Sequence, residues 1–156
     1  MKQRIQTVFL ILVLITSVSM FFLPLISFLS DLLYLKLYVF EFQNLTPDSE
    51  VHFSFATVLP LLLVHLLVIA LTLVTIFTFK NRILQIRLVR FSMLLTILLI
   101  VGIFFLYPNI VMKTAEAQTE WESGAYMPII NMLFLFLANR SILKDEKLVR
   151  SVDRLR

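Results

Sequence analysis

The chain has 156 residues, of which 60% are apolar and 15% charged, with a formal net charge of +4. Soluble domains are about 45–50% apolar and about 25% charged, and a soluble chain of this length cannot bury so much apolar surface. The composition therefore indicates an all-α integral membrane protein. The lack of cysteine excludes disulfides, thiolate zinc sites and iron–sulfur clusters, and only two glycines exclude a glycine-rich nucleotide loop.

The first apolar run is Thr7–Leu29, and at about 1.5 Å per residue a helix of this length exceeds the roughly 30 Å hydrocarbon core. Pro24 lies in its outer third, where a kink is tolerated. A secretory signal peptide is the alternative, because basic residues precede the run and Ser17–Ser19 resembles a cleavage site. The run continues through Met20–Leu23, which favours an uncleaved first span over residues 7–29.

The connection at residues 30–54 predicts a small β-hairpin on the membrane surface. Residues 34–42 alternate between apolar and polar side chains, which is typical of a strand. Turn-forming residues follow at 44–49, and residues 51–55 are the expected second strand.

Three further spans are predicted at about residues 56–79, 88–107 and 125–143. Tyr107-Pro108-Asn109 is expected to end the third, as an interfacial aromatic residue followed by turn formers. The fourth apolar run has only 14 residues before Asn139, about 21 Å of helix, which is short of a full span. It reaches full length if it continues through Leu143 and the Arg140 side chain reaches the interface, and the charge pattern favours a span. The chain is therefore expected to be one four-helix transmembrane bundle, residues 1–156, with a tail at 144–156.

Basic residues sort the connections onto two sides of the membrane. The N-terminus, residues 80–90 and residues 140–156 hold twelve of the fourteen Lys and Arg residues, and the other connections hold only Lys36 and Lys113. Because positive residues stay in the cytoplasm, both termini are predicted to be cytoplasmic and the hairpin is predicted to lie outside.

Ionisable residues inside a span usually mark function, and no Asp, Glu, Lys or Arg lies deep in any predicted span. His65, near the middle of the second span, is a candidate metal or haem ligand or proton relay. A single His is a poor metal site, so a neutral imidazole bonded to a neighbouring helix is favoured. Asn131, with the threonines at 72, 75 and 78, is expected to form interhelical hydrogen bonds, and a polar transport path is the alternative.

No pattern in the sequence indicates catalysis, and neither a metal nor a cofactor is expected. Paired intramembrane carboxylates, nucleophile–base motifs and P-loops are absent. Trp121 and Tyr126 flank Gly124, and they are interpreted as interfacial aromatic residues. A lid over a ligand is the alternative for this pair.

The basic cytoplasmic face is the candidate interaction surface, and its expected partners are proteins and anionic lipids but not nucleic acid. Apolar residues of the tail recur at positions i, i+4 and i+7, which predicts an amphipathic helix. This helix is expected to lie on the anionic inner leaflet or to dock a cytoplasmic protein. The surface comprises Lys80, Arg82, Arg87, Arg90, Lys144, Lys147, Leu148, Arg150, Val152, Arg154 and Leu155.

Three cytoplasmic stretches carry a family resemblance. Residues 1–7, 79–87 and 144–156 are similar to the uncharacterised family of domain of unknown function 4293, small four-span inner-membrane proteins of Bacteroidota. The resemblance implies a bacterial inner-membrane location and implies no activity, cofactor or catalytic residue.

Two functions are consistent with these patterns. The first is a non-enzymatic accessory or scaffold subunit of an inner-membrane complex that acts through the basic cytoplasmic face. The second is a small-solute or lipid transporter or channel that uses His65 and Asn131. A polar cavity around these two residues would favour the second, and a closed bundle would favour the first.

Overall fold

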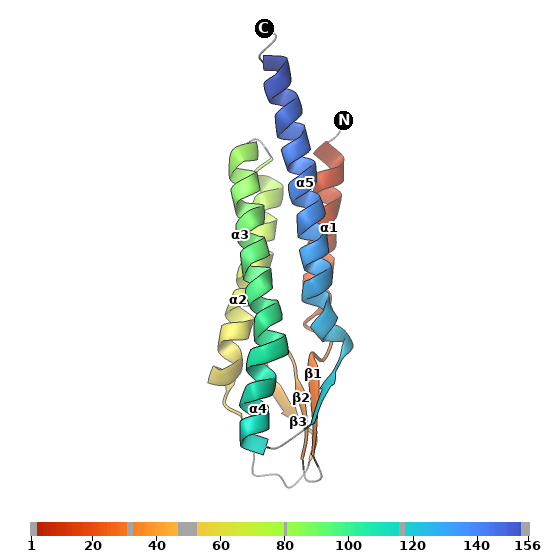
Figure 1. Ribbon diagram of the computed structural model, residues 1–156, viewed down its shortest axis with the longest axis vertical. Coiled ribbons are helices and arrows are strands. Elements are labelled where there is room, and N and C mark those ends of the chain that lie inside the picture. The colour runs from red at the N-terminus through yellow and green to blue at the C-terminus, as the bar shows by residue number, and fades with distance from the viewer. Residues whose placement is uncertain (1–2, 31–32, 47–52, 80, 116–117, 154–156) are drawn as a thin grey trace.

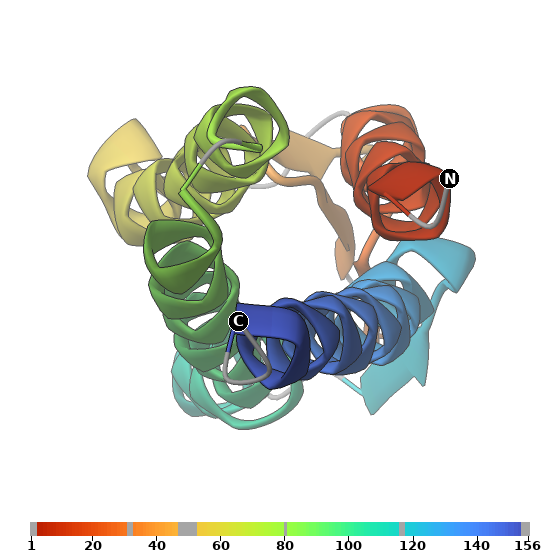
Figure 2. The ribbon, with the colours of Figure 1, turned by 90° about the horizontal axis from the view of Figure 1, so that it is seen from above.

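The computed structural model describes residues 3–30, 33–46, 53–79, 81–115 and 118–153. Within these residues, long helices form an antiparallel bundle, and a small sheet lies at one end of it (Figure 1). Viewed along the bundle, α1, α2, α3 and α5 are arranged in a ring in which each helix contacts the next (Figure 2). The helices are α1 (Gln3–Ser19), α2 (Phe55–Phe77), α3 (Arg82–Val101), α4 (Tyr107–Ala115) and α5 (Met127–Asp153).

The helices predicted at 56–79 and 125–143 are confirmed. The helix α5 continues without a break to Asp153, so the predicted tail helix is the end of α5. At the start of α3, the side chain of Asn81 accepts the amide of Leu84 at 3.1 Å, which is an N-cap. The Asn81 amide donates to the Thr78 carbonyl, so α2 and α3 are joined by a tight turn.

The third predicted helix is longer than expected. The chain stays helical from Arg82 to Ala115 through a π-helical turn, η1, at Gly102–Leu106. The expectation that Tyr107-Pro108-Asn109 ends the helix is therefore wrong. In a regular α-helix the ring of Pro108 would clash with the carbonyl four residues earlier. The wider π turn directly before it changes this spacing, and the helix continues.

The first predicted helix is shorter than expected. The helix α1 ends at Ser19, so the expectation of one continuous helix over residues 7–29 is wrong. After Pro24, the chain turns into the strand β1 (Ile26–Ser30), and the amide of Leu25 already donates to the carbonyl of Leu37 at 2.8 Å. A short apolar run has no periodicity that distinguishes a buried strand from a helix.

The sheet has the strand order β3-β2-β1-β4 and is antiparallel throughout. The strands β2 (Leu33–Leu37) and β3 (Phe42–Asn44) confirm strand structure within the predicted segment 34–42. The predicted hairpin is wrong in its pairing, because β2 pairs with β1 and β3, and α2 already begins at Phe55. Residues 51 and 52 lie outside the described residues. The strand β4 (Gln118–Trp121) joins β1 from the connection between α4 and α5.

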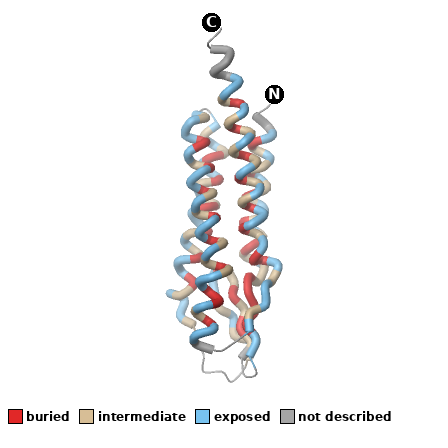
Figure 3. Tube along the Cα trace, viewed as in Figure 1, coloured by how far each residue is buried: buried red, intermediate tan, exposed pale blue. Residues whose placement is uncertain are grey.

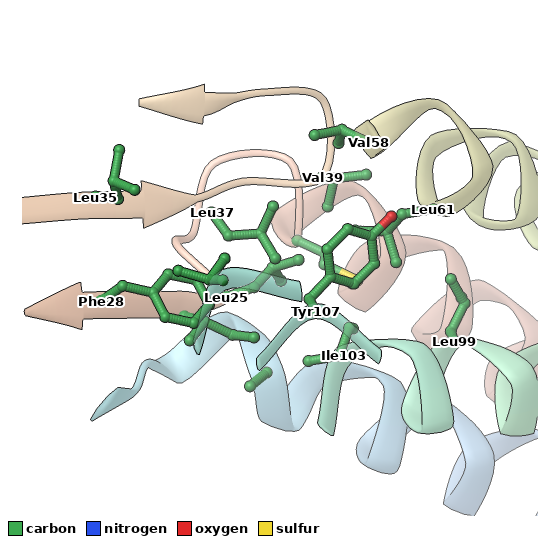
Figure 4. Packing of buried hydrophobic residues seen from close by; sticks show 14 of the residues in the cluster. Leu25, Phe28, Leu35, Leu37, Val39, Val58, Leu61, Leu99, Ile103 and Tyr107 are labelled. Atoms are coloured by element: carbon green, nitrogen blue, oxygen red, sulfur yellow. The ribbon is translucent and has the colours of Figure 1, made fainter. Parts of the chain in front are cut away.

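Buried residues recur at intervals along the helices and also lie in the sheet (Figure 3). At the sheet end, Phe28, Leu35 and Leu37 from β1 and β2 pack in one apolar cluster with Leu61 of α2 and Tyr107 of α4 (Figure 4). A second cluster lies between α1, α3 and α5. The sheet is therefore part of the core of the protein.

The outer faces of the helices carry large apolar side chains, such as Leu94 and Phe105, which are 63% and 65% exposed. Among the described residues, three helical stretches are long and apolar enough to cross a membrane: Phe55–Phe77, Arg82–Lys113 and Ser123–Leu148. The apolar helix at Ile5–Ser19 is shorter. Extended exposed apolar surface of this kind indicates a membrane protein.

Candidate functional site

His65 of α2 and Asn131 of α5 meet at the same residue of α1. Nδ2 of Asn131 donates to Oγ of Ser17 at 2.9 Å, and Nε2 of His65 lies 3.1 Å from the carbonyl oxygen of Ser17. The hydroxyl of Thr16 donates to Oδ1 of Asn131. We refer to Thr16, Ser17, His65 and Asn131 as the interior polar cluster. It joins three helices at the last turn of α1.

The end of α1 explains why His65 bonds to a backbone carbonyl. The last four carbonyls of a helix have no amide partner within that helix. The carbonyl of Ser17 is one of these, because α1 ends at Ser19. The His65 ring satisfies it from the neighbouring helix, which is the kind of interhelical bond that stabilises membrane bundles.

The same geometry assigns the proton on the His65 ring. A carbonyl oxygen can only accept, so Nε2 carries the hydrogen and Nδ1 of the neutral ring is an acceptor. Nδ1 is buried and has no hydrogen-bond partner among the described residues. An imidazolium would place a second N–H there without an acceptor, at a cost in free energy. The geometry therefore fits a neutral imidazole, against which Phe21 packs edge-on with a centroid distance of 5.0 Å.

Ser17, His65 and Asn131 of the interior polar cluster are buried, whereas Thr16 at its edge is half-buried. His65 is 0% exposed and Asn131 is 2% exposed, so His65 touches no space that would admit a water molecule. Among the described residues, no group of three or more His, Cys, Asp or Glu side chains could hold a metal ion. The arrangement can hold helices together, and it leaves no opening beside His65 or Asn131.

The threonines of α2 do not join this cluster. The hydroxyls of Thr72, Thr75 and Thr78 donate to carbonyls four residues earlier in α2, at 2.6–2.7 Å. The expectation that they bond to other helices is therefore wrong. Instead, Nε2 of Gln85 in α3 donates to the carbonyl of Thr75 at 3.1 Å. Sequence reasoning missed Gln85 because the third span was expected to start only at residue 88.

Trp121 and Tyr126 pack around one ring of the π turn. The rings of Trp121 and Phe104 stack with centroids 4.6 Å apart, and Tyr126 meets the same ring edge-on at 6.4 Å. These contacts attach β4 and the 3₁₀ helix η2 (Ser123–Tyr126), which directly precedes α5, to η1. They favour a packing role for the aromatic pair over a lid.

The predicted interaction residues gather at the end of the bundle opposite the sheet. Both termini and the turn between α2 and α3 lie there, and α5 extends beyond its neighbours (Figure 1). We call this surface, formed by residues 80–90 and 140–156, the basic end. Its exposed members among the predicted residues are Arg87, Arg90, Lys144, Lys147 and Leu148, with Arg82 half-buried.

The structure does not describe every residue of the basic end. Lys80, Arg154 and Leu155 are not among the described residues, and Arg150 and Val152 are described only as helical backbone. Within the described part, Asp145 is only 8% exposed. This acidic residue therefore packs against the bundle and is not available to a partner in the way the surrounding lysines are.

We expect His65→Gln to leave the free energy of unfolding within about 1 kcal/mol of the wild type, because glutamine can also donate to the Ser17 carbonyl. The matched variant His65→Leu lacks a donor and should be less stable than His65→Gln. Unfolding in detergent micelles compares them, and metal analysis with absorption spectroscopy checks for bound metal or haem. Stoichiometric metal or haem in the wild type that disappears in His65→Gln would contradict a structural role.

Comparison with known proteins identifies the family. The family model described as "Domain of unknown function (DUF4293)" matches residues 2–155, nearly the whole chain. No curated protein and no solved structure matches the chain.

Proposed function

We propose that this chain, which belongs to the DUF4293 family, is a non-enzymatic accessory or scaffold subunit of a bacterial inner-membrane complex and acts through its basic end. The observation that supports the proposal is the burial of the two interior polar side chains: His65 and Asn131 are buried and bonded to Ser17. A transporter or channel needs polar groups that a solute can reach. The second hypothesis, transport through His65 and Asn131, therefore has no support in this geometry.

The proposed topology has four spans, with both termini in the cytoplasm and the sheet in the periplasm. Its support is the distribution of charge, since residues 1–4, 80–90 and 140–156 hold all of the Lys and Arg residues except Lys36 and Lys113. The 17 residues of α1 measure about 25 Å, short of a hydrocarbon core of about 30 Å. Local thinning of the bilayer accommodates such a difference.

Reporter fusions test this topology. Alkaline phosphatase fused after Asp48 should be active, because α1 would have carried it across the membrane. A fluorescent protein fused to the C-terminus should be fluorescent, and phosphatase fused after Lys80 should be inactive. A periplasmic C-terminus would contradict the four-span topology.

The basic end is the proposed functional surface because of the number and the mixture of its charges. Residues 80–90 hold four Lys or Arg residues and residues 140–156 hold six, and topology alone would be served by fewer. Each basic group near an anionic leaflet contributes only about 1 kcal/mol of attraction. Residues 140–156 also include the acidic residues Glu146 and Asp153, which do not strengthen binding to anionic lipid. A protein partner of complementary charge can recognise such a mixed pattern.

The deciding experiment alters only residues 149–156, because Asp145 is buried against the bundle and must be left in place. One variant is truncated after Leu148. In the other, Val149, Val152 and Leu155 stay fixed while the polar residues between them are permuted, which preserves net charge and amphipathicity. Mild-detergent affinity purification with mass spectrometry should recover partners with the wild type and lose them with both variants. If the permuted variant kept its partners, the docking hypothesis would be wrong and the tail would be only a membrane-surface helix.

A further inference from the structure

An apolar groove of about 240 Å³ opens on the outside of the bundle between α2 and the junction of α3 with the π turn. One wall is formed by Pro60 and Val64 of α2, and the other by Leu98 and Val101 of α3. Leu98 and Val101 are 56% and 48% exposed, whereas Tyr107, which also lines the groove, is 2% exposed. The groove therefore has a buried floor and an open side that faces away from the core.

The open side faces hydrocarbon if the helices cross the membrane as proposed. Both walls belong to stretches that are long and apolar enough to span, Phe55–Phe77 and Arg82–Lys113. Pro60 and Val64 follow the start of α2 at Phe55 by about 8–14 Å along the helix. In a hydrocarbon core about 30 Å thick, this depth lies within the leaflet at the sheet end.

The side chains that line the groove have no free polar group that could bond to a ligand. The Tyr107 hydroxyl already donates to the carbonyl of Thr57 at 2.9 Å. The other lining residues carry no polar side-chain atoms. An apolar cavity of about 150 Å³ is enough to stay dry and to bind benzene. This larger groove has room for a segment of a thin alkyl chain. A side chain from a neighbouring helix is the competing occupant.

Gly102 keeps the groove open. A Cβ atom built on Gly102 would meet nothing within 4 Å, so a side chain there would project into empty space. This glycine is also the first residue of the π turn, and single π turns inside α-helices occur frequently at functional sites. Because it has no side chain, Gly102 leaves its part of the groove lining unfilled.

We propose that this groove binds one acyl chain of a phospholipid from the leaflet at the sheet end. The inference rests on the proposed membrane embedding and is independent of the basic end. Because the lining is apolar, binding is expected to depend on the chain and not on the headgroup.

The test uses the full-length protein in lipid nanodiscs that contain a phospholipid with a photoreactive diazirine in its acyl chain. After illumination, mass spectrometry maps the labelled residues. We expect labelling of Leu98, Val101 and Leu106 to exceed labelling of Leu133 and Phe136, which are equally exposed on α5 but lie outside the groove.

Gly102→Phe should fill the groove and reduce the excess labelling to the level of the α5 residues. The matched control is Ala70→Phe on the exposed face of α2, outside the groove, which should keep the excess. If Gly102→Phe fails to insert, Val101→Trp at the rim serves instead. Uniform labelling in the wild type would overturn the proposal and leave ordinary lipid contact. Weaker labelling in the groove than on α5 would also overturn it, because something other than lipid would then cover the groove. If the labelling test failed while truncation after Leu148 still abolished partner binding, the acyl-chain proposal would be wrong and the proposed function would still be supported.

Discussion

Gly124→Ala is expected to lower the free energy of unfolding by about 3 kcal/mol, at the upper end of the cost of overpacking. A Cβ atom at Gly124 would lie 2.5 Å from the carbonyl oxygen of Pro24 and 2.9 Å from that of Leu23. Both atoms belong to the backbone, so neither can rotate away. The amide of Gly124 donates to the Pro24 carbonyl at 3.0 Å, which brings the two segments this close. The clash would separate the 3₁₀ helix η2, which directly precedes α5, from the link between α1 and β1.

The second glycine provides the control. A Cβ atom at Gly102 meets nothing within 4 Å, and the backbone there is helical, with φ −57° and ψ −54°. We expect Gly102→Ala to stabilise the protein by about 0.5–1 kcal/mol, because alanine is the better helix former. Reversible unfolding in detergent, followed by circular dichroism, measures both variants. Equal stabilities for the two variants would contradict the close approach at Gly124.

The sequence predicts the long helices well because their signal is long and continuous. The run that forms α2 has no charged residue between Phe55 and Phe77, and a turn follows it directly. An apolar run of this length can hardly be anything but a helix, since strands are typically 4–8 residues. The helix at 125–143 has a weaker signal, because Asn139 and Arg140 interrupt its apolar run, and its prediction depended on the basic residues that follow it.

The sheet could not be predicted from local pattern. The strand β1 is apolar like the helix before it, so it was assigned to the first span. The strand β4, Gln118–Trp121, has one apolar residue and no alternation that indicates a strand. Its partner β1 lies far away in the sequence, with Ser27 opposite Glu120. Tertiary contacts of this kind, including the bond from Oγ of Ser27 to Glu122 at 2.8 Å, decide strand structure against local preference.

The sequence predicts the two polar side chains of the site, but it does not predict the backbone carbonyl that His65 contacts. His65 and Asn131 are conspicuous as polar residues inside apolar runs, and the expectation that they bond to neighbouring helices agrees with their contacts to Ser17. Their common partner was hidden, because a carbonyl becomes available only where a helix ends. With α1 expected to continue to residue 29, no free carbonyl was expected at Ser17.

Neighbouring residues of β1 should respond very differently to truncation. Phe28 is 0% exposed and packs in the apolar cluster at the sheet end, whereas Leu29 is 37% exposed on the other face. We expect Phe28→Ala to lower the free energy of unfolding by about 3–5 kcal/mol through lost contacts and a cavity. Leu29→Ala should change it by about 0.5 kcal/mol or less. Successive side chains of a strand point to opposite faces, whereas in a helix they lie on adjoining parts of one surface. Unfolding of both variants under identical detergent conditions measures the difference. Similar, small losses for the two variants would argue for a lipid-facing helix at residues 26–30 and against the sheet.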